Sequence, residues 1–386
     1  MNILIVLWWV GVFVIFWAML GYPVSLSILN KLIKRENAKD YSYEPTVDIM
    51  VTAHNEEKVI EQKLQNLLDM DYPSDKLNIF VASDFSTDKT DDIVKRFATE
   101  HSDRRIQIHR SEKYLGKTNA QNETQEFCQA EILIMTDANA IFEKNAIREI
   151  VASFVSPDIA YVSGRLCYLN ADGSNTATYE GFYWRLDLVC REIESRIQTI
   201  TAGNGAIYAV RNREYVKIPN IESHDSGFPL IYALKKKRAI YNPDAVAYEK
   251  AGEVNEDEFK RKVRMNRRIL NKIAPDIRLF NIFAYRWFAY FYFGHRTCRY
   301  LLWLMHFLVF AINVPLVFCG VWWKSTMILQ LLFYITAIIG WFTKNENRIV
   351  RAIFYYCMTV TAQWKGVINM MTGNSRSTWD KAESTR

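Results

Sequence analysis

The chain has 386 residues, half of them hydrophobic, with 48 basic and 42 acidic side chains. This length exceeds one ordinary domain, and so small a positive excess does not favour a nucleic-acid-binding protein, which gathers basic residues on one face. Residues 2–30 carry no charged side chain, the stretch from Tyr300 onward is mostly apolar, and residues 31–278 have the mixed charge of a soluble domain. We therefore predict a soluble domain between membrane segments, with membrane lipids and no nucleic acid among its partners.

The first segment predicts a membrane anchor within residues 1–30. Residues 3–29 form an uncharged apolar stretch, and about 20 apolar helical residues cross a bilayer. A basic start and a small-residue cleavage site are both missing, so a signal peptide is not indicated. Lys31, Lys34 and Arg35 follow the stretch, which places this end, and the domain after it, in the cytoplasm.

The middle of the chain, residues 44–275, alternates between strand and helix patterns. Short apolar runs predict strands at 47–52, 77–82, 105–109 and 132–135, and amphipathic segments predict helices at 57–68, 88–99 and 118–128. Strands that alternate with helices of this size indicate an α/β fold, in which a mainly parallel sheet is covered on both faces.

The last third of the chain is rich in apolar and aromatic residues. Residues 276–298 predict a helix at the membrane interface, and residues 299–372 predict transmembrane helices with a polar tail at 373–386. The candidate spans are 300–321, 326–342 and 349–371.

Three crossings would put the basic loop from Lys344 to Arg348 in the cytoplasm and the tail after Gly373 outside. However, Gln363 and Lys365 interrupt the last span, and a charged side chain inside a membrane is costly. If this segment lies at the interface instead, the tail stays in the cytoplasm. The predicted protein is in either case a multi-pass integral membrane protein.

Polar motifs follow the predicted strands. They are Ala53-His54-Asn55-Glu56-Glu57, Ser83-Asp84-Phe85-Ser86-Thr87-Asp88, Gly116-Lys117-Thr118-Asn119 and Thr136-Asp137-Ala138-Asn139. One such motif is ordinary turn chemistry, but four at consecutive strand ends indicate a site, because open α/β sheets bind ligands there. Neither G-x-G-x-x-G nor a P-loop is present, so a nucleotide would need carboxylates together with a metal or cations.

These motifs, in this order, resemble those of family 2 glycosyltransferases with the GT-A fold. The resemblance continues through Thr201-Ala202-Gly203-Asn204-Gly205-Ala206, His224-Asp225 and Tyr241-Asn242-Pro243-Asp244. Arg261-Lys262-Val263-Arg264-Met265 stands where polysaccharide synthases carry Q-x-x-R-W. The resemblance covers about residues 46–268. The predicted membrane segments are also arranged as in hyaluronan, chitin-oligosaccharide and poly-N-acetylglucosamine synthases.

The resemblance implies a role for each matching residue. Donor-binding residues would be Ala53, Asn55, Glu56, Asp84, Lys117, Asp137 and Asn139, and acceptor-side residues would be Gly203, Asn204 and Gly205. Asp84 would bind the uracil end, and Asp137 with Asn139 would meet ribose, diphosphate and a Mg²⁺ or Mn²⁺ ion. Asp225 would be the general base and Arg264 would hold the leaving diphosphate, and a single base opposite the leaving group gives inversion.

Three departures from the family pattern have consequences. Asn139 replaces the second carboxylate of the D-x-D motif, which weakens the expected metal site. His224 replaces an acidic residue, and an imidazolium beside Asp225 would lower the pKa of that carboxyl. Arg261 and Met265 replace the Gln and Trp of Q-x-x-R-W, which puts processive synthesis in doubt.

The sequence therefore predicts a transferase that moves a sugar from a UDP-sugar to a growing saccharide for cell-surface polysaccharide synthesis. The resemblance favours UDP-N-acetylglucosamine or UDP-glucose. One alternative is a non-processive enzyme with a lipid acceptor, similar to glucosylceramide synthases, which the altered Q-x-x-R-W favours. The other is a non-enzymatic membrane protein that keeps the fold as a binding module, which the retained Asp84, Asp137, Asp225 and Arg264 disfavour.

Overall fold

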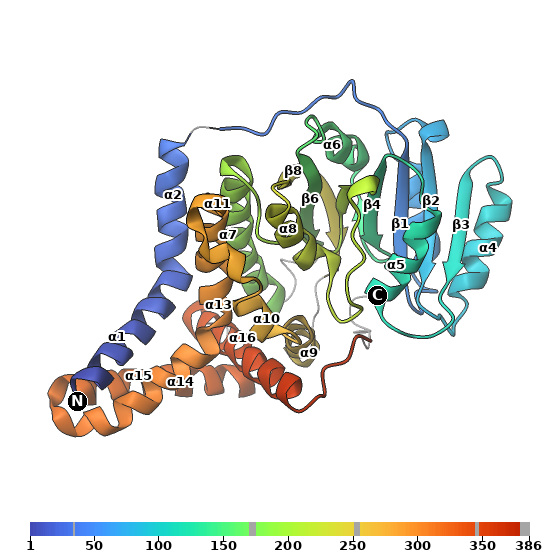
Figure 1. Ribbon diagram of the computed structural model, residues 1–386. Coiled ribbons are helices and arrows are strands. Elements are labelled where there is room, and N and C mark those ends of the chain that lie inside the picture. The colour runs from blue at the N-terminus through green and yellow to red at the C-terminus, as the bar shows by residue number, and fades with distance from the viewer. Residues whose placement is uncertain (34, 170–174, 251–254, 344–346, 379–386) are drawn as a thin grey trace.

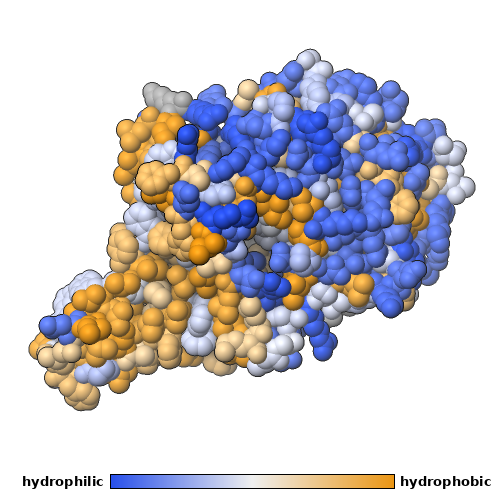
Figure 2. Space-filling model, in the orientation of Figure 1, coloured by the Kyte–Doolittle hydropathy of each residue, from blue (hydrophilic) through white to orange (hydrophobic). Residues whose placement is uncertain are grey.

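The computed structural model describes residues 1–33, 35–169, 175–250, 255–343 and 347–378, and gives the backbone alone for 175–184. An α/β domain lies on one side of the molecule, and long helices from both ends of the chain lie on the other (Figure 1). Figure 2 shows hydrophobic residues over the helical part and hydrophilic residues over the α/β domain. The chain is thus divided into a hydrophilic α/β domain and hydrophobic terminal helices, and the place of these helices in a membrane stays a prediction.

The domain is built on an eight-stranded sheet with the order β3-β2-β1-β4-β7-β6-β8-β5. The strands are β1 (Val47–Ala53), β2 (Leu77–Ser83), β3 (Arg105–Arg110), β4 (Ile132–Asp137), β5 (Ile141–Phe142), β6 (Ile159–Tyr168), β7 (Tyr208–Arg211) and β8 (Arg238–Glu249). β1 to β4 are parallel, as are β6 and β8, whereas β7 runs antiparallel to β4 and β6, and β5 to β8. The sheet is therefore mixed, and the four strands predicted from the sequence form its parallel half.

Helices cover both faces of the sheet, as predicted. They are α3 (Ile60–Leu68), α4 (Thr90–Glu100), α5 (Lys117–Thr124), α6 (Ala146–Ala152), α7 (Asn175–Ile197) and α8 (His224–Leu234). Ile49 and Val51 of β1 pack in the core with α3, α4 and α6, while Met50 packs in the core with α5 and α8. Successive side chains of a strand point to opposite faces, so a strand covered on both sides needs a nearly continuous apolar run.

Three described helices are long and apolar enough to cross a membrane, judged by length and composition. The first spans Asn2–Leu32 and comprises α1 (Asn2–Phe16), a π-helical turn and α2 (Tyr22–Leu32); the others are α14 (Leu302–Leu316), extended by one turn to Cys319, and α15 (Val321–Phe342). Trp8, Val309 and Trp323 form a core that joins these helices. The Met1 sulfur lies 3.6 Å from the Cys319 sulfur, so the start of α1 and the α14–α15 turn lie together.

α16 (Arg348–Met371) packs on the α/β domain and is not among those three helices. Its Tyr355 hydroxyl lies 3.4 Å from the Glu258 carboxylate of α9 (Asn255–Met265), and its Gln363 is buried. After α16 the chain returns to the domain, where Arg267 donates to the carbonyl of Ser377 (3.0 Å). The described part of the tail, residues 373–378, therefore lies on the same side as the catalytic domain, which contradicts the predicted crossing between the two, because α16 uses its polar groups for packing. Lys344 of the predicted loop lies outside the described residues.

The predicted interface region is not one helix. It consists of a 3₁₀ turn (Ile277–Phe280), α11 (Ile282–Tyr285), α12 (Trp287–Phe291), a π-helical turn (Tyr292–Thr297) and α13 (Cys298–Tyr300), and α10 (Ile269–Ile273) precedes it. The break falls at Arg286, whose φ of +50° ends α11. Phe283 is 89% exposed, whereas Phe288 is buried against the domain. The region thus presents an apolar outer surface, and its place at a membrane interface stays a prediction.

Candidate active site

The parallel strands bring two predicted carboxylates to one edge of the sheet. In the strand register Ala53 of β1 pairs with Ser83 of β2, and Thr52 pairs with Asp137 of β4. Asp84 directly follows Ser83, so Asp84 and Asp137 flank the carboxyl end of β1. The sequence predicted this arrangement, because carboxyl ends of parallel strands meet at the same edge.

Asp84 is fully buried and is partly satisfied by backbone groups. Its Oδ1 accepts hydrogen bonds from the N–H groups of Leu115 and Gly116, both at 3.3 Å. Burial raises the pKa of Asp84 above its ordinary value, although these two hydrogen bonds act in the opposite direction. In the part of the chain that the structure describes, Oδ2 has no hydrogen-bond partner. A buried acceptor without a partner needs an explanation, and a ligand that donates a hydrogen bond would supply one.

The residues after β1 hold neighbouring loops in place. Asn55 has a φ of +55°, and its Oδ1 accepts from the N–H of Thr87 at 2.6 Å. The N–H of Glu56 donates to Thr90 Oγ1 at 2.7 Å, and Ala53 is 1% exposed. These contacts shape the end of the sheet around Asp84, and direct donor binding by Ala53, Asn55 and Glu56 stays a prediction.

A lysine–aspartate pair lies beside Asp84. Gly116 has a φ of +102° and opens α5, whose first residue, Lys117, forms an ion pair with Asp137. A Cβ on Gly205 would lie 3.1 Å from Lys117 Nζ and 3.2 Å from Asp137 Oδ2. The backbone at Gly205 therefore borders the pair closely, and the predicted donor and acceptor segments meet here.

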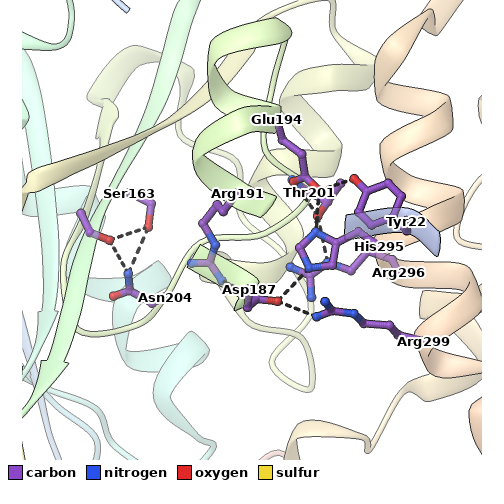
Figure 3. Close-up of polar contacts among 11 residues, drawn as sticks. Tyr22, Ser163, Asp187, Arg191, Glu194, Thr201, Asn204, His295, Arg296 and Arg299 are labelled. Carbon is purple, nitrogen blue, oxygen red and sulfur yellow. Dashed lines mark hydrogen bonds and ion pairs between the residues drawn. The ribbon is translucent and has the colours of Figure 1, made fainter. Parts of the chain in front are cut away.

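The acceptor-side loop is held from within (Figure 3). Asn204 Nδ2 donates to the Gly164 carbonyl at 2.6 Å and to Ser163 Oγ at 3.2 Å, so this side chain fixes the loop. The N–H of Gly203 donates to the backbone carbonyl of Asp225 at 2.7 Å. A single residue, Asn204, therefore separates Gly203, which contacts the backbone of the predicted base, from Gly205, which borders the lysine–aspartate pair.

The predicted imidazolium beside Asp225 is not formed. His224 is 1% exposed, and its ring nitrogens lie 2.8 Å from Gln121 Oε1 and 3.0 Å from the Tyr215 hydroxyl. Burial, followed by the charge of Lys117, lowers the pKa of His224 to about 3, so the ring is neutral at neutral pH. His224 faces the core, where burial disfavours a charged ring, and this orientation cannot be seen in the sequence.

Two arginines approach the predicted site from α9 and its end. Burial lowers the pKa of Arg264, while the charges of Asp137 and Tyr114 favour its cationic form. Burial likewise lowers the pKa of Arg267, and the Asp225 carboxylate opposes this effect. Arg264 is thus in electrostatic reach of the lysine–aspartate pair, and Arg267 is in reach of Asp225.

The segment after α16 closes this edge of the site, which the sequence did not predict. A Cβ on Gly116 would lie 2.6 Å from the Ser377 carbonyl oxygen, so only glycine allows this approach. Arg267 donates to the carbonyls of Arg376 (3.3 Å) and Ser377 (3.0 Å), and Ser375 Oγ donates to the carbonyl of Arg267 at 3.1 Å. Gln363 and Lys365, inside the last apolar stretch, were the residues that could have indicated that this stretch does not cross the membrane and that the chain returns to the domain.

A buried polar network joins α2 and residues 295–299 to α7 of the domain (Figure 3). Asp187 of α7 accepts from Arg191 (2.7 Å), His295 (2.7 Å) and Arg299 (2.8 Å). The other nitrogen of His295 lies 2.5 Å from Glu194, which also accepts from the Tyr22 hydroxyl of α2 at 2.6 Å. The contact between Asp187 and Arg191 could be predicted from their four-residue spacing on one helix face. No sequence pattern indicates the contacts with His295, Arg299 and Tyr22, which lie far away in the chain.

The candidate metal ligands are few. Asp137 and Asn139 lie one residue apart at the end of β4, and both are partly exposed. Among the described residues, no group of three or more His, Cys, Asp or Glu side chains is placed to hold a metal ion. Mg²⁺ is commonly bound by one or two carboxylates together with substrate phosphates and water. One carboxylate and one amide oxygen therefore fit an ion held jointly with a diphosphate, and do not form a complete protein site.

Comparison with known proteins agrees with this geometry. Residues 48–218 match the family model described as glycosyl transferase family 2. The chain is 32% identical over 139 residues to the probable glycosyltransferase YdaM of Bacillus subtilis, a match that covers 36% of this chain and 32% of that protein. It is 31% identical over 127 residues to a beta-monoglucosyldiacylglycerol synthase of Nostoc, covering 33% and 27% of the two chains. The chain thus spans about a third of the length of these relatives.

A solved structure extends the similarity to the whole fold. The mannosyltransferase of Pyrobaculum calidifontis, in complex with GDP-Man and Mn²⁺, superposes with a TM-score of 0.74 at 21% identity. The match covers 95% of this chain and 99% of that one, so it includes helices outside the sheet domain. At this identity the likeness concerns the fold alone. Residues 48–218 therefore match the family 2 glycosyl transferases, and the chain has the GT-A fold.

Proposed function

We propose that the protein is an inverting glycosyltransferase that takes a sugar from a nucleoside diphosphate sugar at the cytoplasmic face of a membrane. The observation that carries the proposal is the buried Asp84 carboxyl, whose Oδ2 has no partner among the described residues, beside the Lys117–Asp137 pair. An N–H of a nucleobase suits that oxygen, and Lys117 suits phosphate. A UDP-sugar, UDP-N-acetylglucosamine or UDP-glucose, remains the favoured donor by family resemblance.

Cations at the site would offset the charge of the leaving diphosphate. Arg264 lies in electrostatic reach of Asp137, and Lys117 is in direct contact with it. Asp137 and Asn139 would hold a Mg²⁺ or Mn²⁺ ion together with the diphosphate, and the similar mannosyltransferase structure with Mn²⁺ supports this assignment. When bound, such an ion supplies positive charge to the departing oxygens.

Asp225 is the general base in this proposal. It stands in the first turn of α8, its backbone carbonyl is hydrogen-bonded to Gly203, and Arg267 is the cation in reach of its carboxylate. A carboxylate placed at the acceptor side takes the proton of the attacking hydroxyl, which contributes about 10²–10⁴-fold to the rate. Attack from the side opposite the diphosphate inverts the anomeric carbon.

The geometry favours a lipid acceptor over the growing polysaccharide that the sequence interpretation placed first. α1, α14 and α15 pack through a shared core of Trp8, Val309 and Trp323, so these three helices fill their own centre. α16 lies against α9 and adds no further span, and a lipid acceptor needs no pore. The named activity of the Nostoc relative, on a diacylglycerol lipid, supports the same choice.

A donor and acceptor screen tests the proposal. The full chain in lipid nanodiscs would be supplied with UDP-sugars or GDP-mannose and with diacylglycerol or oligosaccharide, and nucleotide release and product mass would be measured. Asp225→Asn should lower transfer at least about a hundredfold with donor binding retained. Glu222→Gln is the matched control, because this carboxylate stands three residues before Asp225 and pairs with Arg268 at 3.6 Å. No nucleotide release with any donor, or a fully active Asp225→Asn, would refute the proposal.

A further inference from the structure

α14, α15 and α16 enclose a groove outside the catalytic edge of the sheet. Its volume is about 380 Å³, and its lining includes His306 and Phe310 of α14, Tyr334 of α15, and Val360 and Trp364 of α16. This volume falls within the range of small-molecule sites, about 300–1,000 Å³, and is too small for a protein helix. Two of the three walls belong to helices apolar enough to cross a membrane, and insertion of these helices would place the groove beside lipid.

A polar triad is set into this apolar groove. His306 Nδ1 lies 3.0 Å from the Tyr334 hydroxyl, and Nε2 lies 2.7 Å from the Tyr356 hydroxyl. The helices α14, α15 and α16 therefore each contribute one member. Polar groups are costly within a membrane, and an ionisable residue there indicates a functional site. The lining contains no lysine or arginine, so the triad suits a neutral oxygen, such as an ester carbonyl, and not a phosphate.

The groove is linked to the active site through α16. Tyr356 faces the groove, while its neighbour Tyr355 faces α9, where the Lys262 ammonium lies 4.5 Å from the centre of the Tyr355 ring. Farther along α16, Trp364 lines the groove, and a Cβ on Gly366 would lie 2.7 Å from Cβ of Asn266, which directly follows α9. One helix thus has the groove on one side and the helix that carries Arg264 on the other.

We propose that this groove binds an acyl chain of a neutral glycerolipid, the sugar acceptor, with the His306–Tyr334–Tyr356 triad donating to an ester oxygen. This inference rests on the proposed function and names its acceptor subsite. A glycerolipid held here has its chain beside α14 and α15 and its glycerol end toward α16 and the catalytic domain. A free hydroxyl on that end is the group that the Asp225 carboxylate would deprotonate.

Photo-crosslinking tests the site directly. The probe is a diacylglycerol with a diazirine in one acyl chain, added to the full chain in nanodiscs of neutral lipid, and cross-linked peptides are identified by mass spectrometry. Cross-links should fall on α14 and α16. Thr361→Trp, at an exposed position that lines the groove, should abolish most of them. Thr336→Trp is the matched control, because Thr336 is half-buried on α15 and is not part of the groove lining, and each hydroxyl donates to the carbonyl four residues earlier at 2.8 Å.

Kinetics separate the groove from the donor site. Each methylene kept out of the groove costs about a factor of four in affinity, so Thr361→Trp should raise KM for diacylglycerol about tenfold or more. Tyr334→Phe should raise the same KM, and both variants should keep the wild-type rate of donor hydrolysis without acceptor. Unchanged KM in both variants, or cross-links elsewhere, overturns the groove while the proposed function stands. Cross-links in the groove with no transfer to diacylglycerol overturn the acceptor assignment.

Discussion

Asp187→Asn is expected to destabilise the whole molecule, because Asp187 is the shared partner of two arginines and a histidine in the buried network. The carboxylate is 5% exposed and accepts from Arg191, His295 and Arg299 at 2.7–2.8 Å. Burial alone would raise the pKa of Asp187, yet the charges of His295, Arg191 and Arg299 hold it well below its usual range. An asparagine has the same size but presents an N–H₂ group to at least one donor and leaves buried charge uncompensated.

The size of the effect follows from the burial. Removing one partner of a buried ion pair costs about 3–5 kcal/mol. At about 2.1 cal/mol/K per residue, the 386 residues give an unfolding entropy of about 0.8 kcal/mol/K. The melting temperature should therefore fall by about 4–6 °C, measured by intrinsic fluorescence in detergent at pH 7.

The control for this variant lies on the same helix. Glu192 forms a half-exposed pair with Arg196 four residues later, and helix pairs at this spacing contribute about 0.3–0.5 kcal/mol, so Glu192→Gln should lower the melting temperature by less than about 1 °C. Equal shifts in the two variants would refute the reasoning, because they would show that the buried network contributes no more than a surface pair.

Three further predictions concern the site and the membrane. The pKa of His224 is about 3 in the folded protein and about 6.5 in the unfolded chain. The free energy of unfolding therefore has its full value above pH 6.5 and falls as the pH drops, by about 2 kcal/mol at pH 5, because the unfolded chain binds a proton that folded His224 does not. Urea unfolding at pH 7 and pH 5 should show a smaller decline for His224→Gln. Transfer should stop in excess chelator and in Asp137→Ala, whereas Asn139→Asp should lower the Mn²⁺ concentration needed for half activity; full activity in chelator would contradict the metal assignment. On intact cells, an impermeant thiol reagent should label Cys319, and should not label a cysteine placed at Ser377 in a Cys319→Ser background, since Ser377 lies against the catalytic domain; labelling at Ser377 would disprove this topology.

The parallel half of the sheet could be predicted from the sequence, and the other half could not. β1, β2 and β4 are buried on both faces, so each appears as a mostly apolar run between turn motifs, interrupted by Asp48 in β1 and Asn78 in β2. β8 contains Asn242, Pro243 and Asp244, where its register with β6 shifts between Ser163 and Arg165. An irregularity of this kind removes the alternation that would indicate a strand.

The candidate site was predictable where its residues follow consecutive strands. Asp84, Lys117 and Asp137 meet because strand order fixes which loops share an edge. The neutral state of His224 depends on burial against Gln121 and Tyr215, which no local pattern reveals. The approach of Ser377 to Gly116 depends on how α16 packs on the domain, so the residues next to either position do not predict it.

The position of residues 375–377 late in the chain determines when, during translation, the site can be completed. This segment follows α14, α15 and α16 in the chain, and it supplies the carbonyls that lie over Gly116 and Arg267. A ribosome that has released only the α/β domain has therefore made the donor-side carboxylates without the segment that borders them. The site is completed only after both apolar helices have left the ribosome, which ties its assembly to arrival at the membrane.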